Sequence, residues 1–358
     1  MTQKRWTALA LGMLAIGLLL IVGSVVLIDP FQVYRQATAF VPPIENGTQN
    51  YANAGIAKSY DYDSVIIGSS MTENFRPSQL DALLGGRFVK LPINAGSPFN
   101  NKQMMDLAFG SHAIQTVLYG VDIESFTYFY TTPKCEMPDY LYDDSLLNDT
   151  QYWFNRSVLF KYIPQCLRTW GQHDDQRDSM YMWGDLYPYG KEAALQGTTF
   201  STREVAQTPL EDKPTLSQQT LLNVEHNILP YVEGHPDTEF LFFFPPYSLI
   251  RWYRFYDTGM LNHHQMQKEA IIERLLPYDN VRIYDFQAET AWITDLNHYI
   301  DDGHYGPWIN DAMIEAISRD QYRITNVEQA QQNDAVIRDL VERIRQNGGW
   351  PDSFDITP

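Results

Sequence analysis

The chain has 358 residues, and 44% of them are hydrophobic, which is enough for a large core in one domain or two. Its formal net charge is −18, from 26 Lys and Arg against 44 Asp and Glu. This excess of acid argues against a nucleic-acid partner, because phosphate backbones are bound by basic surfaces.

The N-terminus carries a targeting signal. Lys4 and Arg5 precede Thr7–Ile28, a stretch of 22 residues without a charged side chain. As a helix it would span about 33 Å, roughly the thickness of a bilayer core. The positive charges predict a cytoplasmic N-terminus with the rest of the chain outside the membrane. A cleaved signal peptide is the alternative, although no small-x-small cleavage pattern stands cleanly at the end of the stretch.

The rest of the chain is predicted to form one α/β domain behind a linker. Residues 29–60 contain Pro30, Pro42, Pro43 and a polar stretch, and these predict an extended linker. The expected segments are an anchor with a short cytoplasmic tip (1–28), the linker (29–60), the α/β domain (61–322), and a C-terminal helix and tail (323–358).

Five short apolar runs predict strands, at Ser64–Gly68, Arg87–Ile93, Thr116–Val121, Glu239–Phe244 and Asn280–Tyr284. The runs mostly lack alternation, which is typical of parallel strands covered on both faces. Helices are predicted between them, at Pro77–Leu84, Asn101–His112 and His264–Leu276. This order of strands and helices indicates a doubly wound α/β sheet.

Residues 123–238, between the third and fourth strands, are too many for an ordinary connection and predict an inserted cap. The two cysteines of the chain, Cys135 and Cys166, lie in it and form either one disulfide or two free thiols. Near the C-terminus a helix is expected over about Val327–Gln346, with a capping box of Thr325 and Glu328. His263 and His264, at the start of the preceding predicted helix, are expected to be solvated.

Chemically useful residues follow the predicted strands. Ser69 and Ser70 follow the first, Asn94 to Ser97 the second, and Asp122 the third. Ligands of open α/β sheets bind beyond the carboxyl ends of the strands, so these residues are expected at one edge. Together with an Asp/His-rich loop at residues 295–311, they supply the groups for acyl transfer through a serine ester.

In this hypothesis Ser70 is the nucleophile, and a histidine held by an aspartate takes its proton. Two Asp-x-x-His spacings are present, Asp295 with His298 and Asp301 with His304. We favour the second, because Pro307 can open a helix just after His304 and leave that histidine in a loop above the sheet.

A tetrahedral oxyanion would also need hydrogen-bond donors. The main-chain N–H groups of Ser70 and Gly96 are the candidates, because glycine permits close approach of a substrate.

These motifs, in this order, resemble the SGNH/GDSL hydrolase superfamily, whose first serine motif follows strand one and whose late Asp-x-x-His completes a triad. The phrases around GSSMTENF, FFFPPYS and YIDDGHYGPWIN are similar to a group of membrane-anchored bacterial SGNH-like proteins. The resemblance implies a flavodoxin-like three-layer α/β/α fold. It implies Ser70, His304 and Asp301 as catalytic residues, and Ser70, Gly96 and Asp122 at the oxyanion positions.

Two positions depart from that pattern. The family's Gly-Asp-Ser is Gly68-Ser69-Ser70 here, and its Gly-x-Asn is Gly120-Val121-Asp122. A carboxylate cannot donate unless it is protonated, so Asp122 is a poor oxyanion donor. Either two main-chain donors suffice, Asn100 or Asn101 substitutes, or hydrolysis is feeble.

The resemblance implies an extracytoplasmic esterase or O-acyltransferase of the bacterial cell membrane. It would act on acyl esters, with acetyl the favoured acyl group, of a cell-envelope or secreted glycan. No cofactor or metal is expected, and a membrane-bound O-acyltransferase is a possible partner. The alternatives are an inactive glycan-binding or assembly protein with this fold, and a metal-dependent phosphoester hydrolase that uses the Asp/His cluster.

Overall fold

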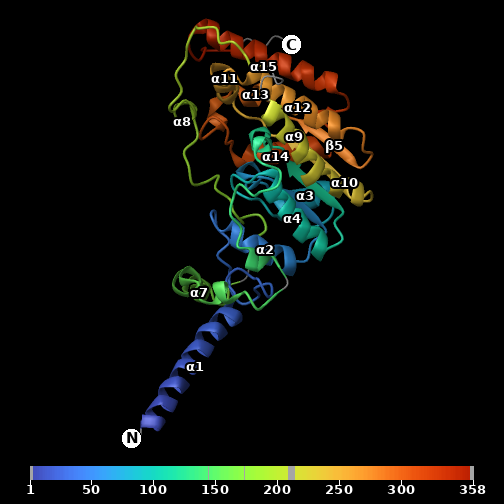
Figure 1. Ribbon diagram of the computed structural model, residues 1–358. Coiled ribbons are helices and arrows are strands. Elements are labelled where there is room, and N and C mark those ends of the chain that lie inside the picture. The colour runs from blue at the N-terminus through green and yellow to red at the C-terminus, as the bar shows by residue number, and fades with distance from the viewer. Residues whose placement is uncertain (1–2, 144, 173, 209–213, 355–358) are drawn as a thin grey trace. The chain divides into compact units, whose positions relative to one another are not determined.

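Figure 1 shows the computed structural model of the protein, which describes residues 3–143, 145–172, 174–208 and 214–354. The chain divides into two compact units. The first comprises Met1–Asp61 and Glu136–Gln176, and the second comprises Tyr62–Cys135 and Arg177–Pro358. The predicted insertion (123–238) is therefore shared between the units, since residues 136–176 belong with the N-terminal segment and the rest of it belongs to the second unit.

Helix α1 (Gln3–Ile28) is the long helix at the N-terminus (Figure 1). It is long and apolar enough to cross a membrane, and few of its side chains are buried. Its length and composition fit both a membrane anchor and a signal sequence.

Residues 29–60, expected to be an extended linker, contain helix α2 (Gln49–Ser59) and buried side chains such as Asp29 and Ile56. Gly55 lets α2 pack closely on the main chain, because a Cβ at this position would lie 2.0 Å from the carbonyl oxygen of Phe31. The unit also contains α5 (Asp139–Tyr142), α6 (Thr150–Trp153), a π-helical turn (Val158–Tyr162) and α7 (Ile163–Arg168). The prolines and polar residues of residues 29–60 predicted an extended linker, whereas the segment is folded.

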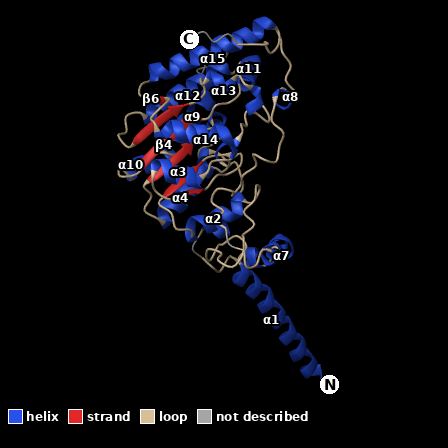
Figure 2. Ribbon diagram, turned by 180° about the vertical axis from the view of Figure 1, so that it is seen from behind, coloured by secondary structure: helices blue, strands red, loops and turns tan. Residues whose placement is uncertain are grey.

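The second unit is built on a six-stranded sheet with strand order β2-β1-β3-β4-β5-β6. Figure 2 shows its strands as red arrows. All neighbouring strands are parallel except β6, which is antiparallel to β5. The strands are β1 (Ser64–Ile67), β2 (Phe88–Lys90), β3 (Thr116–Gly120), β4 (Glu239–Phe244), β5 (Val281–Asp285) and β6 (Arg323–Ile324). The order 2-1-3-4-5 is flavodoxin-like, and the predicted α/β fold is confirmed.

Helices cover both faces of the sheet. The connection from β1 to β2 runs across the sheet in one direction, and the next three connections run in the other. Because parallel crossovers are right-handed, the helices of these two sets lie on opposite faces. Accordingly α3 packs with α14, while α4 packs with α9 and α9 with α12. Their bounds are α3 (Pro77–Leu84), α4 (Pro98–Ser111), α9 (Pro214–Asn227), α12 (Leu261–Leu275) and α14 (Pro307–Ser318).

Most of the remaining strands and helices were not predicted from the sequence. Strand β6 has only two residues, too few for a recognisable apolar run. The other helices are α8 (Lys191–Ala194), α10 (Leu229–Gly234), α11 (Leu249–Asp257), α13 (Thr290–Ile293) and α15 (Val327–Asn347).

Two local predictions need correction. Helix α15 is capped by Asn326, whose side chain accepts from the N–H of Gln329, so the expected capping box of Thr325 and Glu328 is wrong by one residue. His263 and His264 are buried in α12, which begins at Leu261, rather than solvated, and the ring of His264 lies 4.1 Å from that of Phe255 in α11. Burial lowers the pKa of His264 to about 4.

A buried ion cluster joins α12, β5 and α15. Lys268 Nζ lies 2.9 Å from Asp285 and 2.5 Å from Asp334, and all three side chains are fully buried. We expect Lys268→Met to lower the free energy of unfolding by about 3–5 kcal/mol, because it leaves two buried carboxylates without a cation. Urea denaturation followed by near-UV circular dichroism measures this loss. Lys102→Met, which removes an exposed pair with Asp106 on α4, is expected to cost less than about 1 kcal/mol. Equal losses in the two variants would contradict the interpretation.

Candidate active site

A cavity of about 430 Å³ lies at the carboxyl-end edge of the sheet in the second unit. Its wall includes Ser70 after β1, Asn94 after β2, Asp122 after β3 and Tyr247 after β4, and the loop of His304 completes it. Parallel strands thus deliver residues from distant parts of the sequence to one place, as expected for an open α/β sheet.

Ser70 stands at a sharp turn after β1. Gly68 has a φ of +156°, and a Cβ there would lie 2.6 Å from the Thr72 side chain, so the turn requires glycine. The chain then enters a 3₁₀ turn (Ser70–Thr72) that Ser69 caps. Ser70 Oγ lies 2.8 Å from Nε2 of His304. This distance is suitable for proton transfer between the two groups.

His304 is held by a closed loop. An isolated antiparallel bridge joins Tyr299 to Tyr305 at the base of the loop. Asp301 Oδ1 accepts from the main-chain N–H groups of Gly303 and His304, at 2.8 and 2.7 Å. Its other oxygen, Oδ2, lies 2.7 Å from Nδ1 of His304. The carboxylate is therefore fixed before it binds the ring, and it orients Nε2 toward Ser70.

The charges of this pair are mutually stabilising. Burial would raise the pKa of the Asp301 carboxyl, but hydrogen bonds from His304 and the charge of its ring lower that pKa to about 2. Burial would likewise lower the pKa of His304, but the carboxylates of Asp301 and Asp122 outweigh it and hold this pKa above its usual value. The site thus favours the imidazolium that would form when Ser70 loses its proton.

The other Asp-x-x-His spacing lies elsewhere. His298 accepts from Nε1 of Trp308 at 2.9 Å and lies 3.8 Å from Asp295, and neither residue lines the cavity. The structure therefore brings Asp301 and His304 to Ser70, and leaves Asp295 and His298 away from it.

The expected oxyanion donors are only partly available. The N–H of Gly96 donates to the carbonyl of Ile93 at 2.8 Å, so in this structure it is engaged within its own turn. The side-chain oxygen of Asn100 accepts from the N–H of Ser97 at the start of α4, and its amide nitrogen donates to the carbonyl of Cys135. The amide nitrogen of Asn101 donates to the hydroxyl of Tyr119. Both asparagines are buried and their amides are engaged, so neither replaces the missing donor. Among the described residues, the N–H of Ser70 donates to no other group.

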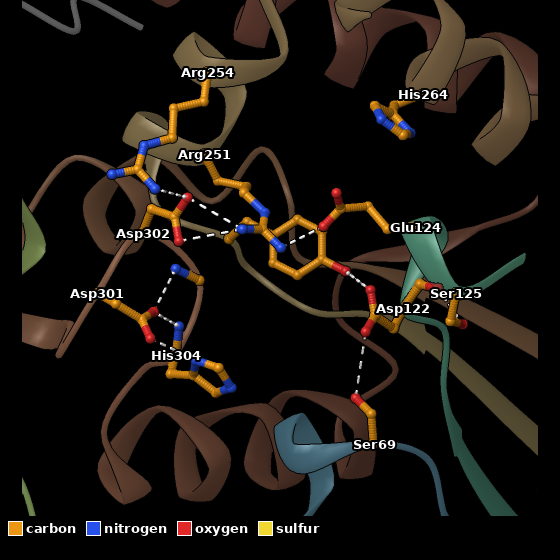
Figure 3. A network of polar contacts seen from close by, with 12 residues as sticks. Ser69, Asp122, Glu124, Ser125, Arg251, Arg254, His264, Asp301, Asp302 and His304 are labelled. Carbon is orange, nitrogen blue, oxygen red and sulfur yellow. Dashed lines mark hydrogen bonds and ion pairs between the residues drawn. The ribbon is translucent and has the colours of Figure 1, made fainter. Parts of the chain in front are cut away.

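Asp122 faces the cavity as an acceptor. Its Oδ1 accepts from the hydroxyl of Tyr247 at 2.7 Å, and its Oδ2 lies 3.5 Å from Ser69 Oγ (Figure 3). An ionised carboxylate in this role has no proton to give to an oxyanion. The geometry thus agrees with the expectation from the sequence that Asp122 is a poor oxyanion donor.

A charged network forms a second wall of the cavity, and no motif in the sequence indicated it. Figure 3 shows Arg251 between Asp302 and Glu124, with Arg254 also bound to Asp302. Burial would lower the pKa of Arg251, but the carboxylates of Glu124 and Asp302 raise it. Burial raises the pKa of Glu124, and Arg251 opposes that change. Asp302 is therefore paired with the two arginines, whereas the neighbouring Asp301 binds His304.

Trp183 is a further residue that the sequence did not single out. Its indole N–H donates to the carbonyl of Ser70 at 3.1 Å, and its ring meets that of His304 edge to face at 5.3 Å. The main-chain N–H groups of Trp183 and Gly184 both donate to the Asn74 side chain, at 3.1 Å. A segment of the predicted insertion thus packs against two residues of the site.

Two alternatives from the sequence find no support in these contacts. Cys135 and Cys166 are free thiols and belong to different units. In the described part of the chain, no three His, Cys, Asp or Glu side chains are arranged to hold a metal ion. The members of the Asp/His cluster at residues 295–304 have separate partners instead. Asp302 binds Arg251, Asp301 binds His304, and His298 accepts from Trp308.

No protein-family model and no curated protein matches the chain. Among solved structures, it is similar to one described as "The structure of a putative platelet activating factor from Streptococcus pneumonia". The identity is 13%, the match covers 77% of this chain and 91% of that chain, and the TM-score is 0.39. A similarity of this degree carries no argument about activity, so function has to be inferred from the residues themselves.

Proposed function

We propose that the protein is a serine esterase or O-acyltransferase that works through Ser70, His304 and Asp301. The observation that carries this proposal is the continuous hydrogen-bonded chain from Ser70 Oγ to His304 at 2.8 Å and on to Asp301 at 2.7 Å. A serine, an imidazole and a carboxylate in this order form the arrangement that activates a hydroxyl at neutral pH.

In the first half of the reaction, Ser70 Oγ attacks the acyl carbon and its proton passes to Nε2 of His304. The tetrahedral intermediate collapses, and His304 gives the proton to the departing alcohol, which leaves an acyl ester on Ser70. In the second half, an acceptor hydroxyl or water loses its proton to His304 and attacks this ester. His304 then returns the proton to Ser70 Oγ.

The oxyanion would be stabilised by fewer donors than in an efficient hydrolase. The N–H of Ser70 is available, whereas Gly96 is engaged and Asp122 accepts. Such a site suits slow turnover, because the same oxyanion site serves both halves of the reaction.

The substrate we propose is an acyl ester, with acetyl favoured, of a cell-envelope or secreted glycan. The polar wall of the cavity suits a hydroxyl-rich ligand, and Tyr128 at the wall, with Lys134 Nζ 4.3 Å from its ring centroid, adds an aromatic ring and a cation. The resemblance to membrane-anchored SGNH-like proteins supports transfer, an α1 that remains in the membrane and an extracytoplasmic second unit. It also suggests a membrane-bound O-acyltransferase as donor.

A second candidate is a glycan-binding or assembly protein without activity. The hydrogen bond that engages Gly96 and the acceptor role of Asp122 favour it, because together they remove two expected oxyanion donors.

One assay separates these functions. The full chain in detergent is mixed with 4-nitrophenyl acetate, with and without a neutral or an anionic oligosaccharide, and both nitrophenol and acetylated oligosaccharide are measured. We expect a burst of nitrophenol equal to the enzyme concentration, followed by turnover that requires the acceptor. Turnover without acceptor would favour an esterase. Absence of both burst and turnover, with oligosaccharide binding retained, would favour the inactive binder.

We expect Asp122→Asn to raise kcat for ester hydrolysis by about tenfold or more, because an oxyanion donor is commonly worth 10²–10³ in rate. The amide keeps an acceptor for Tyr247 and places an N–H₂ where a carboxylate oxygen lies. Steady-state kinetics with 4-nitrophenyl acetate measures the gain. Glu124→Gln is the matched control, since it removes one negative charge from the same cavity without adding a donor at that point. Equal gains in both variants would attribute the effect to charge and contradict the oxyanion explanation.

A further inference from the structure

The segment of residues 150–172 in the first unit exposes an unusual number of large apolar side chains. Phe154, Phe160, Leu167 and Trp170 are 45, 77, 53 and 57% exposed, whereas Val158 and Cys166 of the same segment are buried. Exposed aromatic and aliphatic residues grouped within a few turns mark a surface that meets another apolar phase.

The charge of this segment is opposite to that of the whole chain. Residues 150–172 contain Arg156, Lys161 and Arg168 and no acidic residue, although the chain carries a net charge of −18. Lys161 is paired with Glu45 at 2.7 Å. Arg156 and Arg168 form no ion pair with any described residue and are exposed. Apolar rings beside unpaired cations are typical of protein segments that lie in the interface of an anionic membrane.

The segment is fixed beside the last turns of α1. Helix α1 packs against α6, the π-helical turn and α7, and its Val25 is fully buried. Just after α1, the hydroxyl of Tyr152 donates to Asp29 at 3.1 Å and accepts from the N–H of Phe31 at 3.2 Å. The position of the segment along α1 is therefore set by these contacts.

This position corresponds to one depth in a bilayer. The 22 uncharged residues of α1 span about 33 Å, so its last turns reach the boundary between acyl chains and headgroups. Aromatic side chains concentrate at that boundary, and Arg side chains there extend to lipid phosphates.

We propose that the 150–172 segment lies in the outer interface of the membrane that α1 spans. Phe160, Leu167 and Trp170 insert at the level of the acyl-chain boundary, and Arg156 and Arg168 contact anionic headgroups. This inference rests on the part of the proposed function that keeps α1 in the membrane, and it is independent of the chemistry at Ser70. It gives the first unit a fixed attachment to the bilayer in addition to the helix itself.

The test uses the full chain in vesicles of phosphatidylcholine and phosphatidylglycerol (3:1) with or without bromine at carbons 6 and 7 of the acyl chains, because brominated lipid quenches nearby tryptophan. The contribution of Trp170 is the difference between the wild type and Trp170→Phe. The contribution of Trp6, in α1, is obtained in the same way from Trp6→Phe and reports whether the helix is inserted. We expect at least twofold quenching of both contributions.

Quenching of Trp6 without quenching of Trp170 would overturn the proposal and leave the anchor intact. If neither is quenched, α1 is not in the bilayer and the proposal also fails. A Trp170 shielded from both brominated lipid and aqueous iodide would show that protein, a second copy or a partner, covers the segment instead.

The charge contribution has a test of its own. In the wild type, quenching of Trp170 is expected to increase with the phosphatidylglycerol fraction. In the double variant Arg156→Glu/Arg168→Glu this dependence should disappear or reverse, while quenching of Trp6 stays unchanged. An unchanged dependence in the double variant would refute the role given to the arginines.

Discussion

Ser70→Ala is expected to lower kcat for acyl transfer by about 10⁵–10⁶-fold, since among the described residues that line the cavity no other hydroxyl is hydrogen-bonded to an imidazole. His304→Ala should cost about as much, because the two residues act as one unit. The double variant should therefore be no worse than either single variant. Nitrophenol release and the acyl-enzyme burst measure these losses.

The control for this prediction is Ser69→Ala. Ser69 is the neighbouring serine, but its hydroxyl lies 3.5 Å from both Asp122 and the N–H of Met71 and does not contact His304. We expect it to retain activity within about tenfold of the wild type. A Ser69→Ala variant as inactive as Ser70→Ala would contradict the assignment of the nucleophile.

Asp301→Asn is expected to lower kcat by about 10⁴-fold, because the amide can hold the ring in the wrong tautomer and cannot stabilise its cation. It should also change the pH dependence. His304 must be neutral to accept the proton of Ser70, so the rate rises as the pH increases through the pKa of His304. Asp301 holds that pKa above its usual value, and loss of its charge lowers it. The acidic limb of the pH–rate profile should therefore move to lower pH in the variant.

Asp302→Asn is the matched control for the pH prediction. Asp302 is the adjacent carboxylate, but it binds Arg251 and Arg254 rather than the ring. We expect its acidic limb to stay closer to that of the wild type. If the limb of Asp301→Asn does not move, or moves to higher pH, the Asp301 carboxylate does not control His304.

The fold was predictable because its strands are buried on both faces. Phe242, Phe243 and Phe244 form a run without alternation, and all three are buried in β4. The two-residue strand β6 carries no such pattern. The folding of residues 29–60 together with residues 136–176 was also missed, because it depends on pairing two segments that are far apart in the sequence.

Most of the candidate site was predictable from the order of strands and helices along the chain. Ser70 and Asp122 follow β1 and β3, and strand order alone brings them to one edge. The hydrogen bond that engages Gly96 is a local turn that composition does not reveal. Trp183 and Arg251 reach the site from segments without a recognisable motif, so their positions depend on tertiary packing.

The most direct test of the central claim is the intact mass of the full chain after exposure to a fluorophosphonate, which reacts with activated serines. We predict a single adduct that maps to Ser70 and is absent from Ser70→Ala and His304→Ala. A folded wild-type protein that forms no adduct would contradict the claim that Ser70 is an activated nucleophile, and would favour the glycan-binding alternative.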